Sequence, residues 1–477
     1  MKKFLYLLLI LSFTIIHSQN ILWMKRLDLS QDEYGYCLTK DSSENIIISG
    51  AWAYQNTPGG NCDILILKCD STGDTIWHRQ YDRYPIDFPV DLATEQNGNI
   101  IIASHHSEFS IEIPGLAKFS PDGETLWTRT YSKLAYYIIR GIVLDSFNNI
   151  LACGASLDSP YTFISKFDTS GNLVWSRFYD WGRNGWQDFC DIVLDTAENI
   201  IITGLLGETP DHGDLLVAKF NSNGDSIWTR RFSTGRWITE GISMILDSRG
   251  NIIVSGIDTD GSMSYDCVTV KYSATGSILW NRILDFQLLD YNTGVIVDST
   301  GNIFVAGDCG MPERRDYFLV KYSPSGETLW TSFYNGEYDD ISGGVTIDRQ
   351  GNPIISGSSS NGTNYDILTI KYSGSSGILD STYAYRTGNN SLNIKFSNPI
   401  NRLSKILLQI KKSNYYKIVL HNTLGEVVEI IYQGHLAKGE YYFPLSLNRT
   451  GCYFLRVESE NNSVCRKIIF LDQPQHK

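Results

Sequence analysis

The sequence predicts an all-β protein, a seven-bladed β-propeller followed by a small C-terminal β-sandwich. Aromatic residues make up 12% of the 477 residues, and runs of Ile and Val alternate with Asp, Asn and Gly, which favours strands joined by tight turns. A repeat of about 50 residues, typical of four-stranded propeller blades, occupies most of the chain. Beyond it the net charge changes from −19 over residues 1–383 to +7 over residues 384–477, which indicates a second domain.

Residues 1–18 are expected to form a signal peptide. Lys2 and Lys3 precede an apolar run from Phe4 to Ile16, and polar residues follow it, which is the layout of a secretory leader. The apolar run is shorter than the ~20 residues that a membrane-spanning helix needs. No later segment has the composition of a membrane span, so we expect an exported protein without a transmembrane segment.

Two markers define the blades expected over residues 19–383. One is an Asp-x-x-Gly-Asn turn after the first strand of each unit, whose Asn recurs every 50 to 54 residues from Asn45 to Asn352. The other is a turn of the Ser-x-x-Gly type that leads into a Trp-containing fourth strand. Because these residues recur in every unit and the Asp run is too short for a calcium loop, we interpret them as turn residues and not as metal ligands. The repeat tryptophans are Trp77, Trp127, Trp175, Trp228, Trp280 and Trp330.

An additional copy of the Trp-containing strand, around Trp23, precedes the first unit, whereas the copy near Asp380 has lost its Trp. Pairing the N-terminal strand with the last blade would hide two strand edges and close the ring. Residues near 380 would then lead into a linker at 384–387. The alternative is that residues 378–385 supply the last strand themselves.

These units resemble the repeats of bacterial surface propellers, in which Asp-x-x-Gly-Asn and a β-run are followed by Asp-x-φ-φ-x-Lys-Tyr and Gly-x-x-x-Trp. That resemblance implies an extracellular propeller without an assigned chemistry. The Trp segment also looks like the Trp-docking repeat of pyrroloquinoline quinone dehydrogenases, in which the indole packs between blades. Their adjacent Cys pair is absent here, so the resemblance accounts for the tryptophans and predicts no cofactor.

A binding surface is expected at the end of the ring that carries the variable connections, because binding residues concentrate on variable loops of rigid scaffolds. The connections at 51–61, 105–114, 205–213 and 308–315 differ between units. The tryptophans outside the repeat positions all fall in such connections, and we predict them as binding residues: Trp52, Trp181, Trp186 and Trp237.

Acidic residues recur just before the first strand of most units, and innermost strands begin there. These carboxylates could ring the mouth of the central channel, where carboxylates beside aromatic rings suit a sugar or a cation. The competing interpretation, which we favour, is that each carboxylate caps a loop by accepting backbone N–H bonds. The residues are Glu33, Asp87, Asp188, Glu240, Asp290 and Asp340, with Tyr137 in the third unit.

Motifs for catalysis or metal binding are sparse. The propeller histidines, His78, His105, His106 and His212, form no metal-ligand pattern, and the sequence contains no nucleophile elbow or phosphate loop. The nine Cys residues show no CxxC pair. A net charge of −12 argues against nucleic-acid binding, which needs a basic face. We therefore predict no catalytic residue, no metal and no cofactor, although paired carboxylates for glycoside cleavage could come from different blades.

The C-terminal residues 388–477 are expected to form a β-sandwich, because seven short strands follow one another. The segment resembles the C-terminal sorting domain of the type IX secretion system in Asn398-Pro399, in the Leu-Gly-Glu-Val-Val segment at 424–428, in the Gly-Cys-Tyr-Phe-Leu-Arg segment at 451–456 and in the closing 467–471. Cys452 replaces the usual aliphatic residue. The resemblance implies export across an outer membrane by that machinery. The alternative is a carbohydrate-binding or adhesive sandwich.

Together these features predict a secreted or outer-membrane-surface protein of a Gram-negative bacterium. We predict that it acts as a non-enzymatic binding or adhesion module for a glycan or protein ligand, with the type IX machinery as a partner of its C-terminal domain. The alternatives are a glycan-cleaving enzyme, a quinone-dependent dehydrogenase and a purely structural spacer.

Overall fold

The computed structural model describes strands in two parts of the chain. The described residues are 21–53, 62–108, 111–131, 137–182, 187–209, 212–261, 264–286, 289–311, 314–334, 336–374, 392–395, 405–410, 413–421, 427–445, 451–459 and 462–470. Every regular element within these ranges is a β-strand, and a search of the same residues finds no helix that could cross a bilayer. The expected signal peptide and the linker at 384–387 lie outside the described residues.

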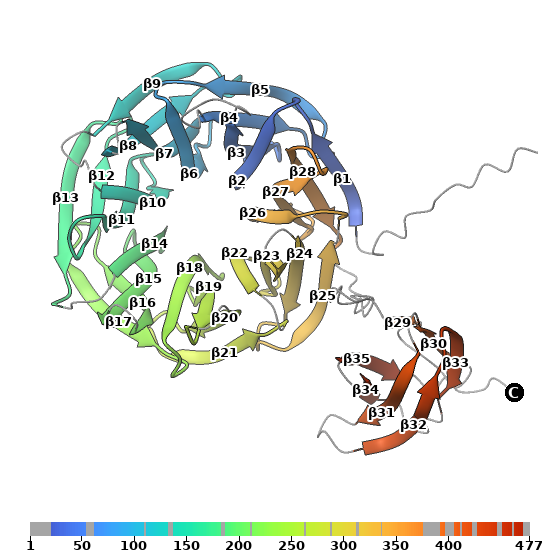
Figure 1. The fold of residues 1–477 in the computed structure, drawn as a ribbon. Coiled ribbons are helices and arrows are strands. Elements are labelled where there is room, and N and C mark those ends of the chain that lie inside the picture. Colours follow the sequence, from blue (N-terminus) through green and yellow to red (C-terminus); the bar gives the residue numbers. More distant parts are fainter. Residues whose placement is uncertain are drawn as a thin grey trace, which may run out of the picture.

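The first part is a ring of four-stranded antiparallel blades, with the first strand of each blade inside and the fourth outside (Figure 1). The first three blades are β2 (Asp32–Lys40), β3 (Ile46–Ala53), β4 (Cys62–Cys69) and β5 (Thr75–Tyr81); β6 (Ile86–Thr94), β7 (Ile100–Glu108), β8 (Ile111–Phe119) and β9 (Thr125–Thr130); and β10 (Tyr137–Leu144), β11 (Ile150–Ser156), β12 (Tyr161–Phe167) and β13 (Leu173–Asp180).

The remaining blades follow the same plan. They are β14 (Gln187–Leu194), β15 (Ile200–Thr209), β16 (His212–Phe220) and β17 (Ser226–Phe232); β18 (Ile238–Leu246), β19 (Ile252–Thr259), β20 (Tyr265–Tyr272) and β21 (Ile278–Leu284); β22 (Leu289–Val297), β23 (Ile303–Met311), β24 (Arg314–Tyr322) and β25 (Thr328–Tyr334); and β26 (Asp340–Ile347), β27 (Pro353–Ser360) and β28 (Tyr365–Tyr372) with β1 (Ile21–Leu27).

Strand β1 completes the blade of β26, β27 and β28, in agreement with the closure expected from Trp23. It pairs antiparallel with β28 from Ile21 opposite Tyr372 to Leu27 opposite Ile367. Arg26 adds an ion pair from Nη1 to Asp366 Oδ2 at 2.7 Å and a hydrogen bond from Nη2 to Ser359 Oγ at 2.7 Å. The ring is thus closed by the first described strand, while residues 378–385 lie outside the description.

The tight turns at one end of the ring are fixed by ion pairs within each blade. In the β14–β17 blade, Asp195 Oδ1 accepts the backbone N–H groups of Ala197 and Asn199, and its Oδ2 lies 2.7 Å from Lys219 Nζ. Burial opposes ionisation of this carboxyl, but these donors together lower the pKa of Asp195 to about 2. The same Lys–carboxylate pair occurs as Lys68–Asp41, Lys118–Glu95, Lys166–Asp145, Lys271–Asp247, Lys321–Asp298 and Lys371–Asp348.

The repeat tryptophans join neighbouring blades. Trp280 Nε1 donates to Pro324 O in the next blade at 3.1 Å, and Gly326 of that turn lies over the indole with φ +84°. Trp23 contacts Gly73 of the β2–β5 blade in the same way, so the closing strand serves as the fourth strand of its blade. These contacts account for the tryptophans through packing.

Several connections expected as variable loops are instead partly strand. Trp52 lies in β3, and the 105–114, 205–213 and 308–315 segments are mostly occupied by the paired ends of β7 and β8, β15 and β16, and β23 and β24. Antiparallel pairing continues almost to the tip, for example from Met311 to Arg314. A hairpin that stays paired satisfies its backbone groups whatever its side chains are, which explains why the variable sequence does not interrupt the strands.

The C-terminal part consists of two antiparallel sheets over one core. One sheet contains β29 (Leu392–Lys395), β30 (Lys405–Ile410) and β33 (Gly439–Pro444), and the other contains β32 (Val427–Leu436), β31 (Asn414–His421), β34 (Gly451–Ser459) and β35 (Asn462–Phe470). Ile406 and Leu408 of the first sheet share a buried cluster with Ile418 and Leu455 of the second. The strands follow the predicted ones, and the sandwich prediction is confirmed.

Candidate functional site

The recurring carboxylates fall into two groups that face different surroundings. Glu33, Asp87, Asp290 and Asp340 are fully buried and accept backbone N–H bonds from the connection that precedes them. Asp87 Oδ2, for example, accepts from Arg83 N at 2.8 Å, and Asp290 Oδ2 accepts from Phe286 N at 2.7 Å. These are the contacts of a loop cap, the interpretation favoured from sequence.

Asp188 and Glu240 lie on the opposite face of their strands. Every inner strand has a β-bulge, and Asp290 lies three residues before the bulge residue of its strand. In the β14 and β18 strands the residues three before the bulge are Gln187 and Thr239, not Asp188 and Glu240. Side chains alternate between the two faces of a strand, so an offset of one residue turns a side chain to the other face. Asp188 and Glu240 are therefore not members of the loop-cap set. They face the interior of the ring.

The bulge itself builds the surface of the central cavity. Each inner strand places one extra residue between two paired residues, and such a residue points away from the ladder. All of these extra residues line a cavity of about 410 Å³. They are Tyr36, Val90, Arg140, Cys190, Ile242, Thr293 and Gly343.

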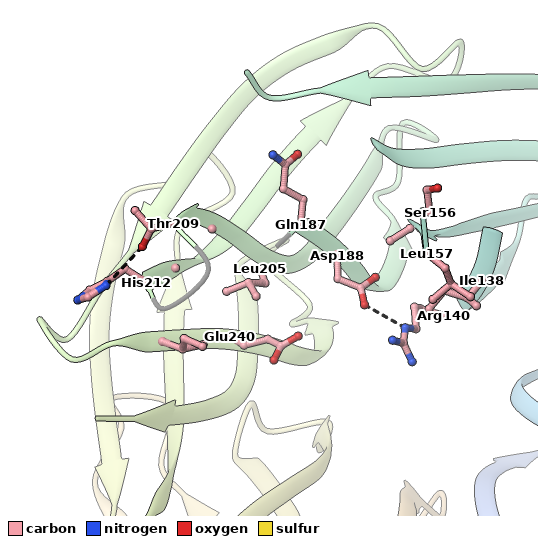
Figure 2. A pocket seen from close by; sticks show the side chains of 14 residues that line it. Ile138, Arg140, Ser156, Leu157, Gln187, Asp188, Leu205, Thr209, His212 and Glu240 are labelled. Carbon is pink, nitrogen blue, oxygen red and sulfur yellow. Dashed lines mark hydrogen bonds and ion pairs between the residues drawn. The ribbon is translucent and has the colours of Figure 1, made fainter. Parts of the chain in front are cut away.

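A second cavity, of about 340 Å³, opens beside the first and shares Arg140, Asp188 and Glu240 with it. It lies among the inner ends of the β10–β13, β14–β17 and β18–β21 blades, at the end of the ring with the longer connections. Figure 2 shows Arg140 beside Asp188, with the Glu240 carboxylate turned toward them and Gln187 pointing away. His212 and Thr209 lie on the far side of the cavity, and the apolar part of its wall includes Ile138, Leu157, Leu205 and Ile238.

The polar groups of this site are incompletely paired. Arg140 Nε donates to Asp188 Oδ2 at 3.0 Å, whereas the buried Asp188 Oδ1 has no hydrogen-bond partner among the described residues. Cys190 Sγ donates to Glu240 Oε1 at 3.4 Å. Burial raises the pKa of Asp188 against the opposing effect of Arg140, and burial together with the Asp188 charge raises the pKa of Glu240. The site thus offers acceptor atoms that a ligand with donors would satisfy.

Two further carboxylates, Asp91 and Asp191, line the central cavity, but backbone amides of the neighbouring blades use them. Asp91 Oδ2 accepts from Ile142 N at 2.7 Å, and Asp191 Oδ2 accepts from Met244 N at 2.6 Å. Burial raises the pKa of each to about 7. Each of these two carboxylates thus joins its own blade to the next one by a hydrogen bond.

Aromatic rings occupy the opposite side of the central cavity. Tyr36 lines it, and its ring packs edge-on against Phe88 at 6.2 Å between centroids and stacks on Tyr34 at 6.3 Å. Tyr36 and Phe88 remain 38% and 39% exposed, which is unusual for aromatic side chains of inner strands. The cavity therefore has an aromatic side and a charged side.

The predicted binding tryptophans are placed differently from one another. Trp52 and Trp181 pack against buried clusters, and Trp181 Nε1 donates to Thr162 Oγ1 at 3.1 Å. Trp237 is 47% exposed and lies 5.8 Å from the His212 ring, at the edge of the smaller cavity. Trp186 lies outside the described residues. Trp237 is thus the predicted tryptophan that the structure places beside the cavity.

Three carboxylate triplets elsewhere have oxygens within 4.8 Å of one another: Asp28, Glu33 and Asp366; Asp63, Asp82 and Asp87; and Asp266, Asp285 and Asp290. In each triplet one carboxylate is already paired with a basic side chain, namely Arg26, His106 and Arg236 respectively. We interpret them as charge networks of the blade connections.

Sequence reasoning missed the bulge residues Arg140 and Tyr36, as well as Phe88, which packs against Tyr36. No motif marks a bulge, so the residues that it turns into the channel carry no recognisable pattern. A signal did exist for the acidic residues. Asp290 precedes its turn aspartate Asp298 by eight residues, whereas Asp188 precedes Asp195 by seven. That difference of one residue corresponds to the change of face.

Comparison with known proteins gives one family match. Residues 389–471 match the family described as the secretion system C-terminal sorting domain. This implies secretion to the cell surface or the extracellular space and recognition by the type IX machinery. The match covers the described sandwich and does not extend into the ring.

The other similarities of this chain are distant. The chain is 20% identical over 434 residues to an uncharacterized WD repeat-containing protein of Acanthamoeba polyphaga mimivirus, a match that covers 61% of this chain and 31% of that protein. The chain thus spans about a third of that relative's length. Among solved structures, an ulvan lyase of a polysaccharide lyase family is 11% identical, with 72% of this chain and 95% of that chain covered and a TM-score of 0.45. Sqt1 from Chaetomium thermophilum is 11% identical, with 80% and 94% covered and a TM-score of 0.41.

Proposed function

We propose that this chain is an exported, non-enzymatic binding protein whose propeller holds a glycan in the two joined cavities of its ring. The observation that supports this most strongly is the meeting of Arg140, Asp188 and Glu240 from three consecutive blades in one cavity, with Asp188 Oδ1 buried and unpartnered. A buried polar atom without a partner is costly to maintain. A ligand that donates to it would remove that cost.

The chemistry of the site suits a sugar. Hydroxyl groups donate to carboxylates and accept from a guanidinium, while the apolar faces of sugar rings pack on aromatic and aliphatic side chains. Tyr36 supplies a ring on one side, backed by Phe88, and Ile138, Leu205 and Ile238 supply an apolar wall. Trp237 extends this surface at the edge of the cavity.

The C-terminal domain supports export as the other half of the proposal. We propose that the mature chain reaches the outer surface of a Gram-negative cell through a leader at 1–18 and the sorting domain from residue 388 onward. Truncation before residue 388 in a host with the type IX machinery should retain a folded ring in the periplasm. Equal surface display of the full and truncated chains would contradict this route.

Binding is tested by a glycan array with the purified full chain, followed by titration calorimetry of the strongest hit. Asp188→Asn and Glu240→Gln should each weaken binding by about 1–3 kcal/mol, because each removes a charged acceptor. Glu327→Gln is the matched control, since Glu327 is an exposed carboxylate in a tight turn at the opposite end of the ring. Equal affinity of all three variants would place the ligand elsewhere.

A second candidate, a glycan-cleaving enzyme, is favoured by one observation. Asp188 and Glu240 come from adjacent blades, face one cavity and both have a raised pKa, as a general acid requires. Incubating the purified chain with the hits of the array distinguishes the two candidates. Release of new reducing ends that Glu240→Gln abolishes would establish the enzyme, and intact glycan after prolonged incubation would support binding alone.

A further inference from the structure

We propose that the group held between Asp188 and Glu240 is a primary ammonium, so that the bound glycan is one that contains an amino sugar with a free amine. This inference rests on the proposed function and narrows it to one class of ligand. It follows from the charges and the hydrogen-bonding capacity of the residues in the two cavities.

The charges of the cavities are unequal. Asp188, Glu240, Asp91 and Asp191 contribute carboxyl groups, whereas the cationic side chain that lines them is Arg140. Arg140 is paired with Asp188 through Nε. Arg140 also attracts the Glu240 carboxylate through space, but the hydrogen bond that Glu240 accepts comes from the Cys190 thiol. An incoming positive charge would restore the balance.

Hydrogen-bonding capacity leads to the same group. An ionised carboxylate only accepts, and an ammonium offers three donors that can be shared among several acceptors. The unpartnered Asp188 Oδ1 and the weakly paired Glu240 are acceptors that need donors. A neutral acetamido group at the same place would bring an acceptor and a methyl group toward the two carboxylates.

A metal ion fits this site less well than an ammonium does. Among the described residues, the sets of three or more His, Cys, Asp or Glu side chains whose ligand atoms lie within 4.8 Å of one another are in the blade connections, and neither Asp188 nor Glu240 belongs to such a set. A calcium ion needs six to eight oxygens at about 2.3–2.6 Å, more than such a pair of carboxylates supplies. An ammonium with its three hydrogens bridges more widely separated oxygens.

The aromatic side of the cavity adds to the attraction. The exposed ring of Tyr36 lines the central cavity, with Phe88 packed edge-on against it, and the face of an aromatic ring attracts a cation within about 6 Å. The same rings can pack against the sugar itself. A polycationic glycan with repeated amines would therefore find complementary groups on both sides.

Proton linkage provides a signature. The pKa values of Asp188 and Glu240 are raised by burial, and a bound cation favours the ionised form of each. Binding should therefore release protons and strengthen as the pH rises through the range in which these two carboxyl groups ionise. Asp91, Asp191, Arg140, Cys190 and His212 also face these cavities, so the Asp188→Asn and Glu240→Gln variants are needed to assign the linkage.

The test uses the full chain and two matched oligosaccharides, a glucosamine oligomer with free amines and its fully N-acetylated counterpart. Calorimetry at pH 7 should show at least about tenfold tighter binding of the free amine, the factor that one charge-assisted hydrogen bond supplies. Asp188→Asn and Glu240→Gln should reduce this preference while Glu327→Gln keeps it. Urea unfolding of each variant, followed by tryptophan fluorescence, verifies that the ring is intact.

The other outcomes are distinguishable. Equal binding of the two oligomers, or a preference for the acetylated one, would overturn the ammonium assignment and leave glycan binding in place. Preferred binding of an acidic oligosaccharide, lost in Arg140→Gln, would also overturn it and identify Arg140 as the anchor. If no glycan binds, the proposed function fails together with the inference.

Discussion

The contact between a turn glycine and the preceding blade's tryptophan can be tested with one methyl group. Gly326 has φ +84°, and a Cβ placed there would lie 2.7 Å from Trp280 Cδ2 and 3.0 Å from Cε2. Gly351 has nearly the same conformation, φ +81°, but a Cβ there would meet only Asp298 Cβ at 3.9 Å. The two positions thus differ mainly in what the added carbon touches.

Both alanine variants pay for the left-handed conformation, about 1–2 kcal/mol for a residue with a Cβ. Only Gly326→Ala also forces a methyl group into a rigid indole, and such overpacking costs about 1–3 kcal/mol. We therefore expect Gly351→Ala to lower the free energy of unfolding by about 1–2 kcal/mol and Gly326→Ala to lower it by about 2–5 kcal/mol.

The assay is urea unfolding followed by tryptophan fluorescence. All 11 tryptophans lie at or before residue 330, so the signal reports the ring and not the sandwich. In the double variant Gly326→Ala/Trp280→Ala the methyl group no longer meets an indole. The double variant should therefore lose about 1–3 kcal/mol less unfolding free energy than the sum of the losses in the two single variants. Equal losses in the two glycine variants, or full additivity in the cycle, would refute the docking role of the indole.

Other predictions follow from the ion pairs and buried carboxyls. Asp195 has its pKa lowered to about 2, so it stabilises the folded ring above about pH 4 and this stabilisation disappears as the pH falls toward 2. Asp195→Asn should therefore make the free energy of unfolding less dependent on pH below about pH 4. Asp191 has its pKa raised to about 7, so its contribution to the free energy of unfolding decreases as the pH rises from about 4 to 7. Asp191→Asn should gain stability relative to the parent chain over that range. Curves of unfolding free energy against pH that run parallel for the variant and the parent would contradict this assignment. Arg26→Met leaves the buried Asp366 without its guanidinium and should cost about 2 kcal/mol, since a buried charge has lost its partner. Arg26→Met/Asp366→Asn should recover part of that loss in the same urea titration, and no recovery would show that Arg26 acts through another contact.

Much of the architecture was predictable because the repeated residues form their hydrogen bonds within a single turn. An Asp with an Asn four residues later closes a turn through local hydrogen bonds, as Asp247 and Asn251 do, and this chemistry requires no knowledge of the rest of the chain. The unpaired copy around Trp23 likewise predicted the closing strand. Both inferences depended on residues that act within or next to their own blade.

The candidate site was harder to predict from the sequence, because the direction of its carboxylates depends on an offset of one residue. Asp188 was grouped with Asp290 by proximity to a strand, and a shift of one position reverses the side-chain face. Arg140 is the extra residue of a bulge, and no sequence motif marks that bulge. Trp52 and Trp181 were assigned to loops because their segments vary, yet both pack on buried clusters. The fold of a blade is local, whereas the lining of the channel depends on all the blades together.

The closing pair of strands has a consequence for how the ring folds. β1 leaves the ribosome before every other described strand, and β28 follows the rest of the ring, so the bond between Arg26 and Asp366 joins residues 340 positions apart. The entropy of closing so long a loop must be met before this pair contributes any stability, and non-local pairing of this kind is slow. Closure is therefore expected as the final step of folding, with β1 and β28 exposing free edges until then. A chaperone that shields the N-terminal strand during transit would prevent those edges from pairing with another copy.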